Sequence, residues 1–180
     1  NSLGMADPTP ATRTVTVLAN SPIGHTGWTL RYVDSQEISG ENGAATNSFD
    51  NANGTMWHTK WAGGSDPLPH EIQIDLGGSY SMNGFRYLPR QDGGTNGRVA
   101  NYEFYTSVDG ITWGSAVASG TFANDATEKE VRFPTVSGRY VRFRALSSQG
   151  GDPYTAAAEL DVDGNLFVGN HSPQGTINQP

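Results

Sequence analysis

The stretch HEIQIDL (His70–Leu76) alternates apolar and polar side chains without interruption. Successive side chains of a β-strand point to opposite faces, so this segment places Ile72, Ile74 and Leu76 together on one face. Its other face carries only polar and charged residues. The stretch therefore predicts a strand that is buried on one side only.

Other segments have the same two-residue period and are rich in β-branched or aromatic residues. In RYVRFR (Arg139–Arg144) the apolar face starts at either Tyr140 or Val141. The predicted strands are Thr14–Leu18, Glu71–Leu76, Gly84–Leu88, Tyr102–Ser107, Glu130–Phe133 and Arg139–Leu146. The turn-rich sequences SVDGITWG, GGSY, RQDGGTNG and SSQGGDPY lie between them. Strands without intervening helical patterns predict an all-β antiparallel sandwich, in which only Thr155–Leu160 has room for helical turns.

The composition supports this fold class. The chain has 180 residues, enough for one domain, and its hydrophobic content is only 35% while aromatic residues make up 10%. We expect Phe85, Tyr105, Trp113 and Phe143 to lie in the core. Cysteine is absent, which excludes disulfides, thiol nucleophiles and cysteine-based zinc sites but leaves secretion possible.

The charge balance limits the possible partners. Eleven basic and 18 acidic side chains give a formal net charge of −7, which argues against nucleic-acid binding and against an anionic membrane surface. No apolar run approaches the roughly 20 residues of a membrane-spanning helix. We therefore expect neither nucleic acid nor membrane as a partner.

The two ends differ from the middle of the chain. Residues 1–12 (NSLGMADPTPAT) resemble a vector scar or linker, and residues 165–180 are rich in Pro, Gly and Asn, as tethers are. These features predict a single domain over residues 13–164 with a C-terminal linker. They also suggest that the chain was cut from a larger protein, although an ordinary frayed terminus is the alternative.

The loop that precedes Trp57 is rich in oxygen donors. Asp50, Asn51, Asn53 and Thr55 offer carboxylate, amide and hydroxyl oxygens, which hard cations such as calcium prefer. The loop lacks the glutamate that an EF-hand carries at its twelfth position. A metal site and a plain Asn-rich and Asp-rich turn both remain open from these residues alone.

His58 is flanked by Trp57 and Trp61. Residues three apart on a strand face opposite sides, so His58 and Trp61 converge only if the strand ends or bends near Thr59. An exposed indole is a suitable platform for the apolar face of a sugar ring. The alternative is that both tryptophans belong to the core.

The polar segment Leu88–Arg98 follows a predicted strand and carries two arginines, an amide and a carboxylate. It has no phosphate-loop motif, but an arginine fork is suited to hydroxyl groups. No GxSxG, HExxH or kinase signature occurs in the chain. Paired carboxylates for glycoside hydrolysis remain possible.

Taken in order, several motifs resemble the coagulation-factor type C (discoidin-like) domain, and more narrowly carbohydrate-binding module family 32. Within that family the chain is similar to the galactose-binding domains of galactose oxidases and bacterial sialidases. The resemblance covers roughly Val15 to Val162. The motifs that carry it are WHTKW (57–61), PHEIQIDLG (69–77), GFRYLPRQDG (84–93), YEFYTSVDG (102–110), WG (113–114), VASGTF (117–122), RYVR (139–142) and AAEL (157–160).

The resemblance implies an eight-stranded jelly-roll β-sandwich that binds sugars and performs no chemistry. It also implies one structural calcium ion between the loop before Trp57 and a glutamate near the C-terminal end. The family often has Asn or Asp where Ala52 stands, so that contact would come from the backbone. The implied ligands are the carbonyl oxygens of Asn47, Ala52 and Ala158, the carboxylates of Asp50 and Glu159, and Thr55.

The resemblance also implies a sugar site on loops at one end of the sandwich. In this interpretation His58 and Arg90 contact the axial O4 of galactose and its neighbour. Trp61 or Tyr154 stacks on the ring. The full implied site is Glu41, His58, Trp61, Arg90, Asn96 and Tyr154. Specificity varies within the family, so uronic acids, amino sugars and β-glucans are alternatives, and Arg86 and Arg98 are candidates for an acidic ligand.

The expected function is that of a monomeric, non-catalytic module of a secreted, extracellular bacterial protein. Its partners would be a galactose-containing glycan and, in cis, the catalytic domain of the parent carbohydrate-active enzyme. Two alternatives are a small glycan-degrading enzyme on the same sandwich and an adhesion domain for protein or phospholipid.

Overall fold

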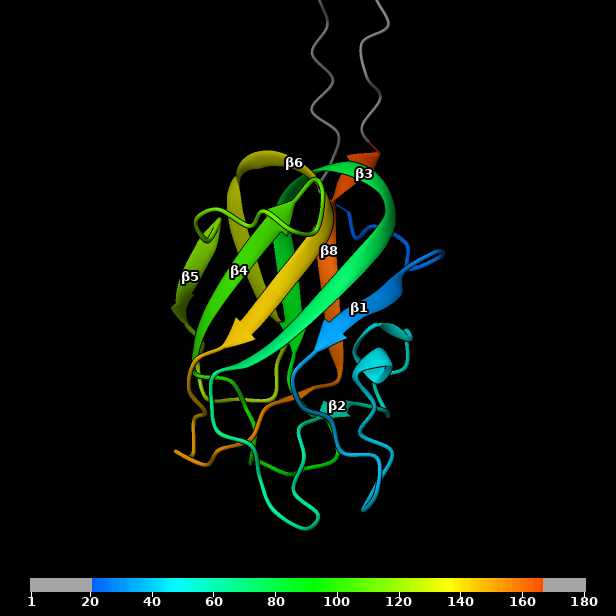
Figure 1. The fold of residues 1–180 in the computed structure, drawn as a ribbon. Helices are drawn as coiled ribbons and strands as arrows, with labels where there is room; N and C mark the ends of the chain where they lie inside the picture. The colour runs from blue at the N-terminus through cyan, green and yellow to red at the C-terminus, as the bar shows by residue number, and fades with distance from the viewer. Residues whose placement is uncertain (1–20, 167–180) are drawn as a thin grey trace, which may run out of the picture.

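The computed structural model describes residues 21–166 (Figure 1). The predicted strand Thr14–Leu18, the segment 1–12 and most of the predicted C-terminal linker lie outside these residues. A short 3-10 helix, η1, spans Ala45–Phe49. The strands of the described part are β1 (Thr29–Val33), β2 (Trp57–His58), β3 (His70–Leu88), β4 (Asn101–Ser107), β5 (Ala118–Thr121), β6 (Lys129–Ala145), β7 (Ala156–Ala157) and β8 (Glu159–Leu166).

All strand pairs are antiparallel, and two long strands belong to both layers of the sandwich. The first part of β3, His70–Asp75, pairs with β1 and with the end of β6. The second part of β3, Tyr80–Leu88, pairs with β8 and with the start of β6. One layer is therefore β1-β3-β6-β4-β5 and the other is β8-β3-β6. The result is the predicted jelly-roll β-sandwich.

The continuity of β3 and β6 corrects the sequence prediction, which divided each of them into two strands. Within β3 the GGSY sequence bends the chain without ending the strand, and the register shifts between Asp75 and Tyr80. Gly77 has a φ of +75°, and a Cβ at this position would lie 2.7 Å from the Gly27 carbonyl oxygen. Glycine is therefore needed at this bend, where the chain passes from one layer to the other.

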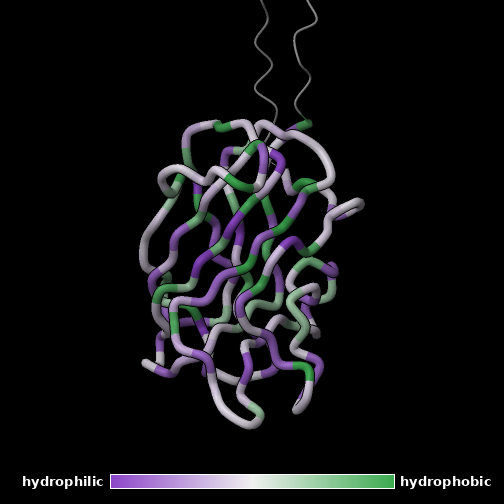
Figure 2. The backbone as a smooth tube through the Cα atoms, viewed as in Figure 1, coloured by the Kyte–Doolittle hydropathy of each residue, from purple (hydrophilic) through white to green (hydrophobic). Residues whose placement is uncertain are grey.

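The core lies between the two layers and is largely aromatic. Figure 2 shows hydrophobic and hydrophilic positions alternating along the strands. Phe85 stacks on Phe104 with 4.2 Å between the ring centroids, and Phe143 is 6.0 Å from Phe85. Val141 is 2% exposed and Tyr140 is half-buried, so the inward face of β6 starts at Val141. Phe85 and Phe143 are thus core residues as predicted.

Two of the predicted core aromatics lie outside the central core, although Tyr105 is buried. Tyr105 and Trp113 are on the outer face of the five-stranded layer, where the Arg142 guanidinium sits 4.0 Å and 4.9 Å from their ring centroids. In β4 the inward positions are occupied by Tyr102 and Phe104. Tyr105 therefore has outer-face neighbours, and its hydroxyl donates to the outer-face residue Glu103.

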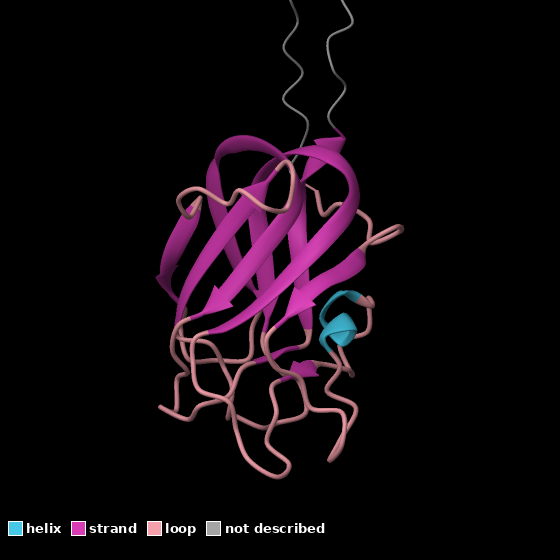
Figure 3. Cartoon of the chain, in the orientation of Figure 1, coloured by secondary structure: helices cyan, strands magenta, loops and turns pink. Residues whose placement is uncertain are grey.

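The segment Thr155–Leu160 contains no helical turn; it supplies β7 and the start of β8. The last strand continues to Leu166, two residues into the predicted linker. Within residues 21–166 no helix is long and apolar enough to cross a membrane. The long connections after β1, β2, β3 and β6 gather at one end of the sandwich, the lower end in Figures 1 and 3.

Candidate functional site

The six residues implied for sugar binding lie together at this loop end. Trp61 Nε1 donates to Glu41 Oε1 at 2.9 Å, and the same oxygen lies 3.9 Å from His58 Nδ1. The His58 and Tyr154 ring centroids are 5.6 Å apart. Arg90 and Asn96 complete the group from the loop after β3. The structure thus brings side chains from four separate segments into one cluster, which we call the loop site.

His58 has a fixed orientation in this cluster. Its ring is buried, and Nδ1 donates to the carbonyl oxygen of Thr59 at 2.7 Å. Nε2 lies 3.3 Å from the amide nitrogen of Asn96, so it accepts a hydrogen bond. His58 therefore presents an acceptor nitrogen to the loop site.

Arg90 provides the complementary donor. Its Nε and Nη2 donate to the two carboxylate oxygens of Asp92 at 2.7 Å and 2.5 Å, and its Nη1 donates to Asn96 Oδ1 at 2.5 Å. The hydrogen bonds between the Arg90 and Asp92 side chains raise the pKa of Arg90 and lower that of Asp92 to about 2. Asp92 therefore stays ionised and holds the guanidinium plane, while Asn96 joins Arg90 to His58.

Trp61 is the exposed aromatic of the loop site. Strand β2 ends at His58, so the chain turns before Trp61 and both side chains reach the same cluster. Trp61 is 42% exposed, whereas Trp57 is fully buried. The alternative in which both tryptophans belong to the core is therefore wrong for Trp61.

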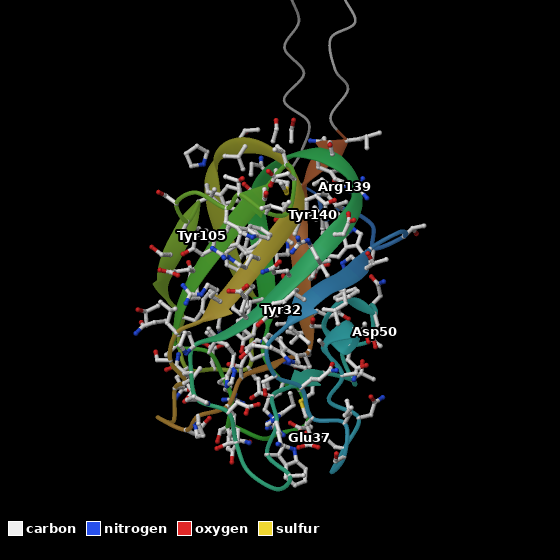
Figure 4. The ribbon with its side chains drawn as sticks, viewed as in Figure 1. Tyr32, Glu37, Asp50, Tyr105, Arg139 and Tyr140 are labelled. Carbon is white, nitrogen blue, oxygen red and sulfur yellow. The ribbon has the colours of Figure 1, made fainter. Side chains whose placement is uncertain are left out.

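A buried carboxylate, which the sequence did not point to, positions the segment that carries Trp61. Glu37 is 1% exposed and accepts hydrogen bonds from four backbone N–H groups. The donors and their distances are Ser39 (2.7 Å), Gly40 (2.8 Å), Trp61 (2.9 Å) and Ala62 (2.7 Å). These hydrogen bonds, with that of Ala62 the strongest, lower the pKa of Glu37 to about 2. Glu37 lies at the loop end in Figure 4.

Gly40 also positions the indole of Trp61. A Cβ on Gly40 would lie 2.5 Å and 2.7 Å from two carbons of the six-membered ring. The ring therefore packs directly against the backbone at this glycine. Together with the hydrogen bond from Nε1 to Glu41, this contact leaves the indole little freedom to turn.

His70 holds the loop that carries Tyr154. It is fully buried, with Nδ1 2.7 Å from Asp34 Oδ2 and Nε2 2.8 Å from the carbonyl oxygen of Pro153. Both nitrogens face acceptors, so both donate and the ring is an imidazolium. Burial lowers the pKa of His70, but the hydrogen bonds to Asp34 and Pro153, with the nearby charge of Asp66, outweigh it and raise the pKa above 6.5.

We expect His70 to make the protein less stable as the pH rises above neutrality. A raised pKa means that the folded chain binds this proton more tightly than the unfolded chain does. The contribution is therefore complete below the ordinary pKa of 6.5 and is lost as the pH rises through the higher folded value. The difference in free energy of unfolding between the wild type and His70→Gln, from urea denaturation, should shrink between about pH 6 and about pH 9. A difference that is constant over this range would contradict the imidazolium assignment.

A second cluster, formed by the residues implied for calcium, lies beside η1 and away from the loop site. The backbone N–H of Ala52 faces Asp50 Oδ1 at 2.8 Å and Glu159 Oε1 at 2.7 Å. Thr55 Oγ1 is 2.7 Å from Asp50 Oδ2 and 2.8 Å from the Ala52 carbonyl oxygen. The carboxylates of Asp50 and Glu159, more than 100 positions apart in the chain, thus approach the same backbone N–H group. Asp50 is labelled in Figure 4.

The chemistry of this cluster fits a cation. Glu159 Oε2 is buried and has no hydrogen-bond partner. Burial raises the pKa of Glu159 to about 7, and the charges of Asp161 and Asp50 add to the effect. Within residues 21–166 no three acidic or histidine side chains converge, so backbone oxygens would have to supply most of the ligands. A hard cation accepts such ligands and would satisfy the free oxygen.

The other two implied calcium ligands, Asn47 and Ala158, are sequence neighbours of residues in this cluster. Asn47 lies in η1, and its side-chain amide donates to the carbonyl oxygens of Asn42 and Met56. Ala158 is buried and directly precedes Glu159. A role for their own carbonyl oxygens stays a prediction.

Residues 31–160 match the F5/8 type C domain family. The chain belongs to this family. A sialidase of Micromonospora viridifaciens is 44% identical over 133 residues, which cover 73% of this chain and 20% of the sialidase. A galactose oxidase of Gibberella zeae is 36% identical over 164 residues, which cover 88% of this chain and 24% of the oxidase. The chain therefore spans about a fifth to a quarter of the length of these relatives.

Solved structures identify the branch of the F5/8 type C family. A family 32 module of Clostridium perfringens in complex with GalNAc-β-1,3-galactose has a TM-score of 0.71 and 32% identity, with coverage of 79% of this chain and 99% of that module. Another family 32 module of that organism, in complex with galactose, has a TM-score of 0.69 and 29% identity, with coverage of 81% and 99%. The chain is thus a carbohydrate-binding module of family 32, a family of non-catalytic modules.

Proposed function

We propose that the loop site binds galactose-type sugars and that the module directs an attached carbohydrate-active enzyme to glycans bearing them. The observation that carries this proposal is the arrangement around Asn96, whose side chain joins the His58 acceptor to the Arg90 donor. A hydroxyl group both donates and accepts, so a hydroxyl placed between His58 and Arg90 can replace both contacts of Asn96. Galactose differs from glucose in the direction of its O4, which a fixed donor and acceptor pair can discriminate.

The exposed indole of Trp61 supports the same assignment. One face of galactose presents C–H groups, which pack well against an aromatic ring. Glu41 binds the indole N–H and has oxygen lone pairs left for further sugar hydroxyls. Tyr154, whose ring centroid lies 5.6 Å from that of His58, offers a second aromatic surface. Galactose and a galactose-containing disaccharide are bound by two modules to which this chain is similar.

The proposal includes one structural calcium ion. Asp50 and Glu159 would bind it through carboxylate oxygens, Thr55 through its hydroxyl, and Asn47, Ala52 and Ala158 through backbone carbonyls. The ion would supply a fixed positive charge between the first part of the domain and its last strand. Its role is to stabilise the fold, because the cluster lies apart from the loop site.

The attached enzyme is inferred from relatives. The chain covers only a fifth to a quarter of a sialidase and of a galactose oxidase, whose remaining length carries other parts of those proteins. We propose that this module likewise accompanies a secreted, extracellular enzyme and works as a monomer. A single shallow site binds weakly, so the module would act through local concentration and multivalency.

Calorimetric titration with galactose and with glucose tests the sugar assignment. We expect a dissociation constant for galactose between millimolar and tens of micromolar, which corresponds to about 4–6 kcal/mol, and weaker binding of glucose. A glycan array would extend the test to linked galactose and to N-acetylgalactosamine. Equal binding of galactose and glucose would contradict the role given to His58 and Arg90.

A further inference from the structure

A hollow lies on the outer face of the five-stranded layer, separate from the loop site. Its volume is about 560 Å³, within the roughly 300–1,000 Å³ typical of small-ligand pockets. Figure 4 shows this face toward the viewer, with Tyr32, Tyr105, Tyr140 and Arg139 distributed across it. The hollow is lined by Arg31, Tyr32, Asp34, Pro69, Glu71, Gln73 and Arg144. None of the residues of the loop site contributes to it.

A β-bulge in β1 builds this hollow. The pairing of β1 with β3 shifts between Leu30, opposite Ile74, and Tyr32, opposite Gln73, so Arg31 is the extra residue. Ile74 faces the core and Gln73 therefore faces outward, which also places Tyr32 on the outer face. The bulge thus presents two consecutive side chains, Arg31 and Tyr32, on the outer surface, where a regular strand would present one.

Arg31 is held in place by neutral groups. Its Nη1 donates to Gln73 Oε1, and its guanidinium carbon lies 5.7 Å from the centroid of the Tyr140 ring. Among residues 21–166 no carboxylate forms an ion pair with Arg31, and the residue is exposed. Arg31 lines the hollow and has no ion-pair partner of its own, although the charge of Asp75, which is paired with Arg139, also acts on it.

The acidic side chains of this face are already committed to other cations. Asp34 lies 2.7 Å from the His70 imidazolium. Glu71 Oε2 is 3.5 Å from Arg144 Nε, and Arg144 Nη1 is 2.7 Å from a carboxylate oxygen of Glu103. Among the four charged residues that line the hollow, Arg31 is thus the one without an ion-pair partner. An anionic ligand is the complementary partner.

We propose that this hollow is a second sugar site, specific for carboxylated sugars such as hexuronic acids and sialic acids. The sugar carboxylate would bind the guanidinium of Arg31, a charge-assisted contact suited to the arginine fork. The ring of Tyr32, which is 47% exposed, is the platform for the apolar face of the sugar. Gln73 and Glu71, joined by a 2.6 Å hydrogen bond, offer an amide and a carboxylate to the sugar hydroxyls.

NMR titration of the whole chain with sodium glucuronate, sodium N-acetylneuraminate and methyl glucuronate ester tests this site. We expect at least one of the two acids to shift the amide resonances of Arg31, Tyr32 and Gln73, and the uncharged ester to bind much more weakly. The two acids distinguish a hexuronate site from a sialic acid site. Chemical shift changes confined to the loop site, or equal binding of the acid and its ester, would overturn the proposal.

Two matched variants distinguish a specific site at Arg31 from a general attraction of anions to this face. Arg31→Gln should weaken binding of the acid about tenfold or more, because it removes the only charge that the carboxylate contacts. Arg139→Gln removes the same charge from the same face, and Arg139 also lies over Tyr140, but it is paired with Asp75 outside the hollow. This variant should lose much less affinity than Arg31→Gln does, because its only effect on the site is to leave Asp75, whose charge acts on Arg31, without its partner. An equal loss in both variants would indicate general attraction of anions and reject the site.

The outcome is independent of the proposed galactose site. Arg31→Gln should leave galactose affinity unchanged, and Trp61→Ala should leave binding of the acid unchanged. If Trp61→Ala abolishes binding of the acid, the acid occupies the loop site and the second site is rejected. If galactose fails to bind, while the acid binds to the wild type and more weakly to Arg31→Gln, only the proposed function is rejected.

Discussion

Replacing Trp61 with alanine should abolish measurable galactose binding and change the melting temperature little. The Trp61 side chain is 42% exposed, so its loss removes a contact with the sugar without opening a cavity in the core. At about 25 cal/mol for each Å² of apolar surface removed from water, a sugar-on-indole contact of roughly 100 Å² contributes about 2.5 kcal/mol, a large part of the 4–6 kcal/mol expected in total. A sub-millimolar constant would then move to the millimolar range or beyond. Calorimetry with galactose and a thermal melt of the same sample measure both effects.

Two further variants make this test specific. Ile111→Ala removes an exposed apolar side chain at the opposite end of the sandwich, and it should bind galactose normally. Gly40→Ala keeps the indole but adds a methyl group where the ring now lies. We expect it to weaken binding because the platform is displaced. Wild-type affinity in Trp61→Ala would show that the sugar binds elsewhere.

The sequence predicted the fold class because the strand signals are strong and local. The alternation from His70 to Leu76 places Ile72 and Ile74 in the core as expected. The sequence did not show that β3 continues through Gly77, because a glycine is typical both of a turn that ends a strand and of a bend within one. The pairing of β3 with β6 on both sides of Gly77 shows that this is a bend. Strands β1 and β5 were missed since they lie at the sheet edge and bury little, so their sequences have no clean alternation. Strands β7 and β8 were also missed, because Thr155–Leu160 was assigned possible helical turns.

The same contrast holds for the candidate sites: some of their residues lie in local sequence motifs, and others depend on contacts between distant parts of the chain. His58, Trp61 and Arg90 lie in recognisable motifs, and the structure gathers them with the other three predicted residues. Glu37 and His70, which hold the loops in position, have no local signature. The contacts that hold the loops are long-range, because Trp61 is 24 residues from Glu37 and Pro153 is 83 residues from His70. In a sequence, a carboxylate that accepts four backbone N–H groups looks like any surface glutamate.

Removal of calcium should lower the melting temperature by on the order of 10 °C. An ion present at about a thousand times its dissociation constant stabilises the folded state by about 4 kcal/mol, provided that the unfolded chain does not bind it. For a domain of this length each kcal/mol corresponds to roughly 2–4 °C. Differential scanning calorimetry in excess EDTA and in millimolar calcium should reveal this difference. Melting temperatures that are the same in both conditions would reject the calcium site.

Glu159→Gln gives this test its sharpest form, because its effect should change sign with calcium. The amide oxygen of glutamine can still accept from the Ala52 N–H, so the contact at 2.7 Å is preserved. In EDTA the variant should be at least as stable as the wild type, since it no longer buries a carboxylate oxygen without a partner. In calcium it should be less stable, because a neutral amide binds the ion more weakly than a carboxylate does. Glu128→Gln, at an exposed ion pair with Arg86, should show no such reversal. A Glu159→Gln variant that retains the full response to calcium would place the ion elsewhere.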